Sequence, residues 1–261
     1  MIGARMGPTV TGRVAALLGA FDTTHAAMSL TELARRAELP LTTTHRIVGE
    51  LARSGLLERD DAGRYRIGLR LWEIASTAAR TVDLRDAALP VLQELYAATH
   101  ENVQLAVLDG TEAVYLERVS GPRAVHIITR AGSRLPVHAS GVGLALLAHA
   151  PVEVQDEVLV APLRRFTRYT VTDPRRLRRA LADIRRDGYA ISDRQIETVS
   201  LSVAAPIRDR TGRVVAAVSV VAAAQTDPRQ LIAPVRAAAT SISRRLPIVT
   251  TVDAHSRPAK L

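Results

Sequence analysis

The chain has 261 residues, of which 47% are hydrophobic and 23% charged, and it contains no cysteine. The hydrophobic content excludes a wholly disordered chain. The absence of cysteine excludes a disulfide scaffold, thiolate-bound zinc and a cysteine nucleophile. The length predicts two domains. The net charge of +9, with Lys260 as the single lysine among 35 basic residues, permits a nucleic-acid partner but does not locate a binding surface.

The first apolar residues occur at helical spacing from Val10 to Phe21. The continuous apolar stretch among them is short and adjoins Arg13. We therefore interpret this segment as a helix rather than an export signal. The longest apolar run, 214–224, is much shorter than the roughly 20 residues that cross a membrane. We therefore expect a cytoplasmic protein without a membrane partner.

Two further helices follow in close succession. Ser29 and Glu32 form a capping-box pattern at the start of the second helix. Pro40 marks the break after this helix, because a proline disfavours a helical conformation in the residue before it. The third helix is predicted over residues 42–54, with Gly55 suited to its C-terminal cap. Two helices joined by a tight turn are typical of a helix-turn-helix.

A β-hairpin is predicted next, from extended runs at 56–59 and 64–68 around a turn that ends at Gly63. Helix, helix, tight turn, helix and hairpin together predict a winged helix-turn-helix whose third helix enters the DNA major groove. An ordinary small bundle without DNA contacts is the alternative. The exposed polar residues favour DNA binding, and the candidates are Thr42, Thr43, Thr44, His45, Arg46, Arg64 and Arg66.

These candidates have different expected roles. Thr43 and Arg46 are the best candidates for contacts to base edges, because a guanidinium suits guanine. The hydroxyls of Thr42 and Thr44 are expected on phosphates, as are the wing residues Arg64 and Arg66.

The remainder of the chain predicts an α/β unit with hairpin-linked, antiparallel strands and a side pocket for a small molecule. A helical connector over 72–80 leads to a helix over 83–99 that Pro90 kinks or splits. The predicted strands are 103–107, 113–119, 125–129, 201–207 and 213–221, and the predicted helices are 140–149, 151–160, 174–187 and 228–246.

Catalytic and cofactor motifs are lacking. The stretch 138–143 fails the Gly-x-Ser-x-Gly pattern, because His138 and Val142 replace its outer glycines. No phosphate-binding loop and no metal-ligand spacing of histidines occurs, so no catalytic residue, metal or cofactor is predicted. His126 is interpreted as packed or facing a ligand. The arginines of helix 174–187 are interpreted as a solvated face rather than a second nucleic-acid surface.

Five short motifs carry a family resemblance: Leu-Pro-Leu-Thr-Thr-Thr-His-Arg-Ile at 39–47, Tyr-Arg-Ile-Gly at 65–68, Leu-Pro-Val-His-Ala-Ser-Gly-Val-Gly at 135–143, Asp-Gly-Tyr-Ala at 187–190 and Ala-Ala-Pro-Ile at 204–207. In this order and spacing, the chain resembles the IclR family of bacterial transcription regulators from about residue 10 to 246. The resemblance implies an α+β protein with four parts: a winged helix-turn-helix over 8–70, a linker helix over 71–82, a GAF-like effector domain over 83–247 and a flexible tail over 248–261.

The resemblance also implies a pocket against the sheet, at the positions that match the family: Gly141, Val142, Ser192, Ser202, Ser219 and Val221. It implies homodimers or homotetramers that act at partly palindromic operators in double-stranded DNA and control catabolic genes. Leu144 stands where the family often has lysine, so a different effector is expected.

The sequence therefore predicts a regulator, not an enzyme, in which a small organic effector shifts the relative pose of two DNA-binding domains. The alternative is a small-molecule-binding protein or enzyme whose winged helix serves association. A protein that coats DNA without sequence preference is a second alternative, but it leaves the second domain without a role.

Overall fold

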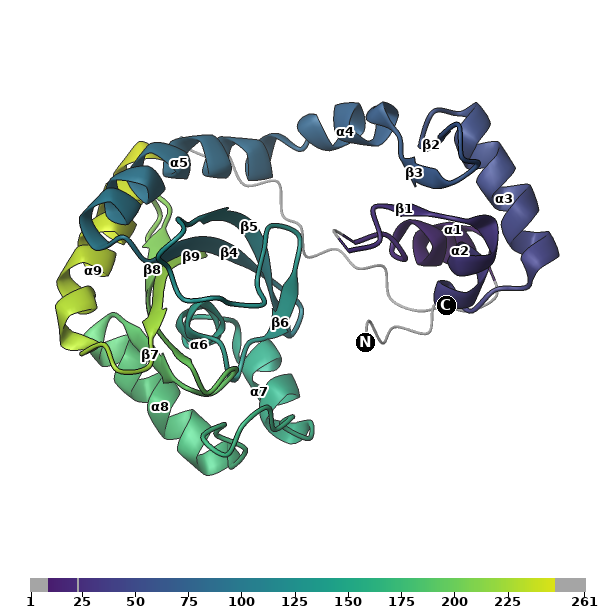
Figure 1. Cartoon of the computed structure of the whole chain (residues 1–261). Coiled ribbons are helices and arrows are strands. Elements are labelled where there is room, and N and C mark those ends of the chain that lie inside the picture. Colours follow the sequence, from purple (N-terminus) through teal and green to yellow (C-terminus); the bar gives the residue numbers. More distant parts are fainter. Residues whose placement is uncertain (1–8, 23, 247–261) are drawn as a thin grey trace. The chain divides into compact units, whose positions relative to one another are not determined.

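The computed structural model describes residues 9–22 and 24–246, and the chain divides between Ala79 and Arg80 into two compact units (Figure 1). The tail predicted over 248–261 lies outside the described residues. The predicted α+β class is confirmed, because helices and a small sheet form the first unit and a larger sheet with helices forms the second.

The first unit has the predicted winged-helix order. Its helices are α1 (Val10–Leu18), α2 (Leu30–Arg36) and α3 (Leu41–Arg53). Its strands are β1 (Ala27–Met28), β2 (Leu57–Arg59) and β3 (Tyr65–Ile67), in the antiparallel order β1-β3-β2. The short strand β1 was not predicted. One core joins these elements, built on Leu17, Met28, Leu33, Ile47, Val48, Leu51, Leu57 and Tyr65.

Local signals set the boundaries in this unit. The capping box is formed as predicted, since the N–H of Glu32 donates to Ser29 Oγ while the N–H of Ser29 donates to the Glu32 carboxylate. Gly55 follows the C-cap of α3 with φ +73°, and Gly63 closes the hairpin turn with φ +76°. Glycine adopts this left-handed backbone without steric penalty, so both turns form where the sequence predicts them.

The second unit is built on one six-stranded antiparallel sheet with the order β6-β5-β4-β9-β8-β7. Its strands are β4 (Asn102–Asp109), β5 (Glu112–Val119), β6 (Arg134–Pro136), β7 (Ala190–Asp193), β8 (Ser200–Arg208) and β9 (Val214–Ala223). Its helices are α5 (Ala79–Thr99), α6 (Gly141–Leu147), α7 (Val152–Val160), α8 (Pro174–Asp187) and α9 (Arg229–Arg245), and α4 (Leu69–Ser76) precedes them at the end of the first unit.

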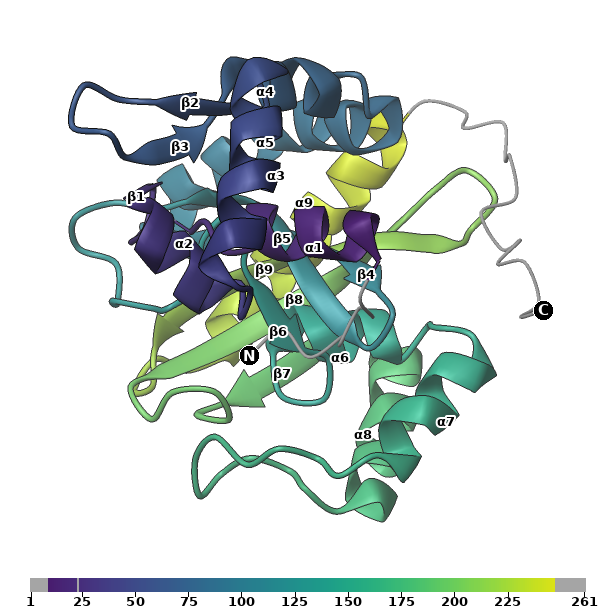
Figure 2. The ribbon, with the colours of Figure 1, turned by 90° about the vertical axis from the view of Figure 1, so that its right-hand side faces the viewer.

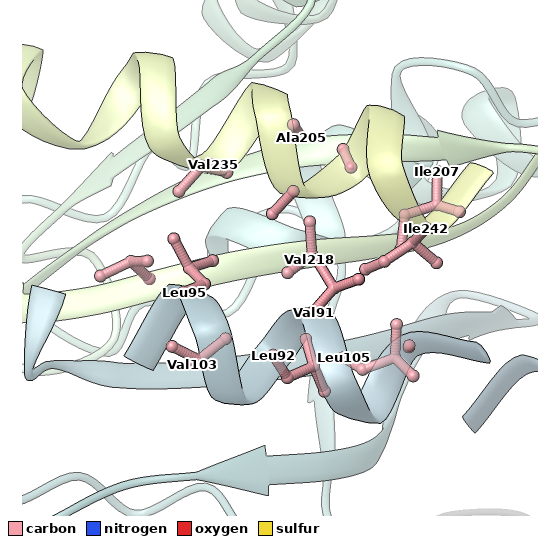
Figure 3. Packing of buried hydrophobic residues seen from close by; sticks show 14 of the residues in the cluster. Val91, Leu92, Leu95, Val103, Leu105, Ala205, Ile207, Val218, Val235 and Ile242 are labelled. Atoms are coloured by element: carbon pink, nitrogen blue, oxygen red, sulfur yellow. The ribbon is translucent and has the colours of Figure 1, made fainter. Parts of the chain in front are cut away.

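Helices cover both faces of this sheet (Figures 1 and 2). On one face, α5 and α9 pack on alternate strand residues such as Val103, Leu105 and Val218 (Figure 3). On the other face, α6, α7 and α8 pack on the intervening residues, including Ala106 and Ala217. Because side chains alternate between faces along a strand, strands such as β4, β8 and β9 contribute to both cores. The α6 face also receives polar residues of β4, β7 and β8, and these matter for the site below.

One prediction in this unit is wrong. Residues 125–129 do not form a strand, and β6 pairs with β5 at the sheet edge instead. The backbone of this segment is held by side chains of the neighbouring strands rather than by a strand partner. Of the two alternatives predicted for Pro90, a kinked or a split helix, the split is excluded, because α5 continues through the proline. Ala88, Val91 and Leu92 around the proline are buried, and this packing offsets the missing backbone hydrogen bond.

Within residues 9–22 and 24–246, no helix combines the length and apolar character that crossing a bilayer requires. No group of three or more histidine, aspartate or glutamate side chains gathers in metal-binding geometry in that part of the chain either.

Candidate functional site

The first candidate site is the N-terminal turn of α3. Its N-cap residue, Pro40, provides no side-chain hydrogen bond to the free N–H groups of this turn. Thr42, His45 and Arg46 are exposed here, and Thr43 is half-buried. Uncapped N–H groups beside hydroxyls and a guanidinium suit the phosphate oxygens and base edges of DNA.

Thr44 does not join this surface. Its side chain is completely buried, and its Oγ1 has no hydrogen-bond partner among the described residues. Residue 44 precedes Ile47 and Val48 by three and four positions, so all three lie on the face of α3 that packs into the core. The expected contact between Thr44 and a phosphate is therefore corrected, because the helical period turns this residue inward.

The three candidate arginines of the first unit are exposed and each pairs with a carboxylate. Arg46 Nη1 lies 2.9 Å from Glu50 Oε1, one helical turn further along α3. On the hairpin, Arg64 lies 3.1 Å from Asp60, and Arg66 lies 2.8 Å from Glu58. Exposed pairs of this kind contribute about 0–1 kcal/mol, so each guanidinium is held only weakly by its carboxylate.

The wing carboxylates are held ionised by their own hydrogen bonds. The backbone N–H of Leu69 and then the Arg66 guanidinium lower the pKa of Glu58. The backbone N–H of Arg64 is the main cause that lowers the pKa of Asp60. Both carboxylates therefore remain charged at neutral pH and keep the arginine side chains extended along the hairpin.

The second candidate site is a narrow cavity of about 40 Å³ in the second unit, on the α6 face of the sheet. All six strands of the sheet, the start of α6 and two connecting segments contribute to its lining. The lining residues are Gln104, Tyr115, Ile127, Thr129, Leu135, Ser140, Gly141, Ser192, Gln195, Ile196, Glu197, Ser200, Ser202 and Val221.

Four of the six predicted effector residues line this cavity: Gly141, Ser192, Ser202 and Val221. Val142 does not, because it points into the hydrophobic core around α6. Ser219 also lies outside the lining, although β9 pairs it with Gln104 and Ala204. It is fully buried, and its Oγ has no hydrogen-bond partner among the described residues.

The start of α6 lies very close to β8. A Cβ atom added to Gly141 would overlap Ser202 Oγ and lie 2.9 Å from Ser202 Cβ, closer than atoms approach in real structures. Ser192 Oγ donates a 2.6 Å hydrogen bond to the carbonyl of Ala139, just before α6. Glycine at position 141 is therefore required by the packing of the helix on the cavity wall.

Several polar lining residues were missed by the sequence analysis. Gln104 alternates with Val103 and Leu105 along β4, and its amide donates to Thr129 Oγ1. Tyr115 is hydrogen-bonded to Ser140, and burial raises the pKa of its hydroxyl. A glutamine within an apolar strand was a signal for a polar site, because buried polar side chains are rare unless they have a partner.

A pair of polar residues on the strands holds one cavity wall in place. Arg118 Nη2 and Nε donate to Asn102 Oδ1 at 2.8 and 3.2 Å, and Arg118 Nη1 donates to the carbonyl of Thr129 at 2.9 Å. Asn102 Nδ2 donates to the carbonyl of Val125 at 2.8 Å. No carboxylate in the described part of the chain pairs with Arg118, and burial lowers its pKa. We call Asn102 and Arg118 the strand clamp, because they fasten the 125–129 segment beside the cavity.

Known proteins match both units. The IclR helix-turn-helix domain matches residues 10–61, and the C-terminal domain of the bacterial transcriptional regulator IclR matches residues 76–244. The transcriptional regulator KipR of Bacillus subtilis is 32% identical over 84% of this chain and 90% of its own length. The transcriptional repressor AllR of Klebsiella pneumoniae is 32% identical over 83% of this chain and 80% of its own length.

Solved structures agree. An IclR homologue of Microbacterium hydrocarbonoxydans in complex with 4-hydroxybenzoate is 42% identical, with a TM-score of 0.87 over 91% of this chain and 99% of the other. Thermotoga maritima IclR is 28% identical, with a TM-score of 0.72 over 90% of this chain and 97% of the other. The family models span most of both units, and the related proteins are regulators rather than enzymes. The chain therefore belongs to the IclR family of transcriptional regulators, with a helix-turn-helix DNA-binding domain and a C-terminal effector-binding domain.

Proposed function

We propose that this regulator binds a partly palindromic operator through α3. When the narrow cavity beside α6 widens around a small organic effector, the protein leaves the operator or changes its arrangement on it. The exposed, uncapped start of α3 is the observation that supports DNA reading at this helix. Thr43 and Arg46 read base edges, His45 lies beside them, and Thr42, Arg64 and Arg66 hold phosphates. Since the operator is chromosomal DNA, the protein acts in the cytoplasm.

The direct test selects fragments of the organism's own sheared genome with the purified protein at near-physiological salt. We expect enrichment of a few fragments that share an imperfect palindrome. Retention of all fragments, in proportion to their length and with a steep salt dependence, would contradict sequence-specific regulation. The neighbouring genes, which we expect to serve catabolism, then nominate effectors.

Replacing Arg46 by alanine should weaken operator binding by about 1–3 kcal/mol and relax specificity at one base pair. The measurement is the dissociation constant for the operator and for variants with each base pair changed in turn. Arg53→Ala is the matched control, because Arg53 is an exposed arginine in the last turn of the same helix. Equal effects of the two substitutions would contradict the placement of α3 in the groove.

We further propose that the protein is a homodimer or a pair of dimers, with α4 in an interface between copies. This helix buries none of its residues, although Leu69, Trp72 and Ile74 are 63%, 68% and 50% exposed. Burying an apolar side chain of this size contributes about 1.5–3 kcal/mol, so a second copy of α4 is a favourable occupant.

Leu69→Gln with Ile74→Gln should shift the dimer–monomer equilibrium toward monomer by at least about tenfold, because two apolar side chains of the interface become polar. Sedimentation equilibrium measures the shift. Trp72 is the only tryptophan in the chain, so its fluorescence should move to longer wavelength as the interface opens. Val152→Gln, at an exposed apolar residue on α7, is the control. Unchanged sedimentation and emission in the double variant would contradict this interface.

The effector is proposed to be a small organic molecule with hydroxyl or carboxylate groups. The supporting observation is the polar lining of the cavity by side chains of β4, β7 and β8, such as Gln104, Ser192 and Ser202. A relative that is 42% identical is bound to 4-hydroxybenzoate, which makes hydroxylated aromatic acids the first compounds to test. Calorimetric titration with such compounds, followed by operator binding in their presence, decides whether they are effectors.

A further inference from the structure

Most of the protein's net positive charge is concentrated in one short part of the second unit. Residues 164–179 contain seven arginines and one aspartate, in a chain whose total net charge is +9. All seven arginines are exposed. We call them the arginine surface, and its members are Arg164, Arg165, Arg168, Arg175, Arg176, Arg178 and Arg179.

The arginine surface is continuous from the loop after α7 to the first turns of α8. Arg165 Nη2 donates a 2.9 Å hydrogen bond to Thr172 Oγ1, next to the N-cap residue of α8. That residue, Asp173, accepts a hydrogen bond from the backbone N–H of Arg175. Arg165 is therefore fastened to the same end of the helix that carries Arg175 and its neighbours.

Aromatic rings order two of the loop guanidinium groups. Arg164 lies 4.7 Å from the ring centre of Phe166. Arg168 lies 4.9 Å from the ring centre of Tyr169 and donates to its hydroxyl. A guanidinium over a ring keeps edge N–H groups free for an outside acceptor while its motion is restricted.

The arginines at the two ends of α8 differ in their ion pairing. In the last turn, Arg186 pairs with Asp183 and Asp187, and Arg185 donates to the carbonyl of Ala148. In the first turns, Arg178 has one long contact, 3.8 Å, to Asp156. Three more arginines there form no ion pair with any described carboxylate: Arg175, Arg176 and Arg179.

The unpaired arginines are placed where they destabilise the helix. The N-terminal end of a helix carries a partial positive charge, so cations there are unfavourable, and like charges three or four residues apart repel. Acidic residues are absent from the first turn of α8. Asp173 at the N-cap and the more distant Asp156 offset part of this charge, and the remaining excess of positive charge suits an outside anion.

We propose that the arginine surface binds the phosphate backbone of duplex DNA without sequence preference, as a second DNA contact in addition to that of the winged helix. Guanidinium groups match phosphate oxygens in charge and geometry. Residues 164–179 expose no large apolar side chain of the kind that anchors protein interfaces. The proposal rests on DNA binding by the first unit. Once that unit is bound, the arginine surface of the same chain meets the DNA at a high effective concentration. This role is the alternative to the solvated face that the sequence favours for the arginines of this helix.

The test measures binding of the full-length protein to a 40-bp duplex that lacks the operator, over a series of KCl concentrations. Arg175→Gln, Arg176→Gln and Arg179→Gln are combined in one variant. Its control combines Arg85→Gln, Arg134→Gln and Arg186→Gln, which remove the same charge from ion-paired arginines elsewhere on the unit.

We expect the first variant to reduce the slope of log K against log [KCl] by about one for each phosphate that it no longer neutralises, and to weaken binding at low salt by at least about tenfold. The control should keep the wild-type slope. Equal slopes for wild type and both variants would overturn the proposal. Binding of polyglutamate is measured for the same proteins. If the first variant lost polyglutamate binding but kept the wild-type salt slope for DNA, the proposal would also be overturned, because the partner would then be an acidic protein.

Folding is checked separately, by thermal unfolding of both variants. Removal of repelling charges from the start of α8 should leave the Tm of the first variant equal to or above that of the wild type. A lower Tm would show that these arginines stabilise the fold and would contradict an unfavourable repulsion among them.

Discussion

Replacing Gly141 by valine is expected to abolish effector binding and leave operator binding intact. The new Cβ would overlap Ser202 Oγ and lie 2.9 Å from Ser202 Cβ. Rotation of the serine hydroxyl relieves the first clash but not the second. Both the start of α6 and β8 are buried, so the valine methyl groups are forced into a cavity of about 40 Å³.

The expected cost of this overpacking to folding stability is about 1–3 kcal/mol. Calorimetric titration with an effector measures its binding to the variant, and operator retention on a gel measures DNA binding. An effector response with wild-type affinity in Gly141→Val would show that the ligand binds elsewhere.

A paired set of smaller changes keeps this prediction testable if the valine variant does not fold. Gly141→Ala alone retains the clash with Ser202 Cβ, whereas Ser202→Gly in the same chain removes that atom. Effector affinity should fall in the single variant and recover, at least in part, in the double variant. Equal affinities in both would mean that steric contact between α6 and β8 does not control the cavity.

Local patterns determined which parts of the fold were predictable. The capping box at Ser29 and the glycines at 55 and 63 act within a few residues, and each forms the expected cap or turn. In contrast, Val125 and Ile127 alternate like strand residues, but their segment is held by Asn102 and Arg118, which no short pattern connects to it. Long-range hydrogen bonds to side chains therefore explain the wrongly predicted strand.

The same distinction applies to the sites. Exposure of Thr42 and burial of Thr44 follow from the helical period, and closer attention to Ile47 and Val48 would have predicted the difference. The cavity lining could not be predicted from such a local pattern, because Gln104, Thr129 and Glu197 come from three separate segments. The family resemblance located the α6 and β8 positions, but only the tertiary structure brings these three residues to them.

The strand clamp gives the second prediction with a large effect, for Asn102→Ala. Asn102 is fully buried and bonds both the Arg118 guanidinium and the carbonyl of Val125. The substitution removes these bonds and leaves the partly buried Arg118 cation with its hydrogen bond to the carbonyl of Thr129 alone. Because hydrogen bonds to charged groups are strong and unpaired buried groups are unfavourable, the free energy of unfolding should fall by about 2–4 kcal/mol.

The clamp should also control the effector. Ile127 and Thr129 line the cavity and belong to the segment that the clamp fastens. Asn102→Ala should therefore increase amide hydrogen exchange across residues 125–129 and weaken effector binding by at least about tenfold, equivalent to about 1.4 kcal/mol.

Arg85→Gln is the control for Asn102→Ala, because it removes a half-exposed arginine that pairs with Glu117 on the neighbouring strand and makes no contact with the 125–129 segment among the described hydrogen bonds and ion pairs. It should leave both hydrogen exchange at 125–129 and effector affinity unchanged. Faster exchange in Asn102→Ala without a loss of affinity would contradict the role of this segment as a cavity wall. Unchanged exchange would show that other contacts hold the segment and that the clamp contributes to stability alone.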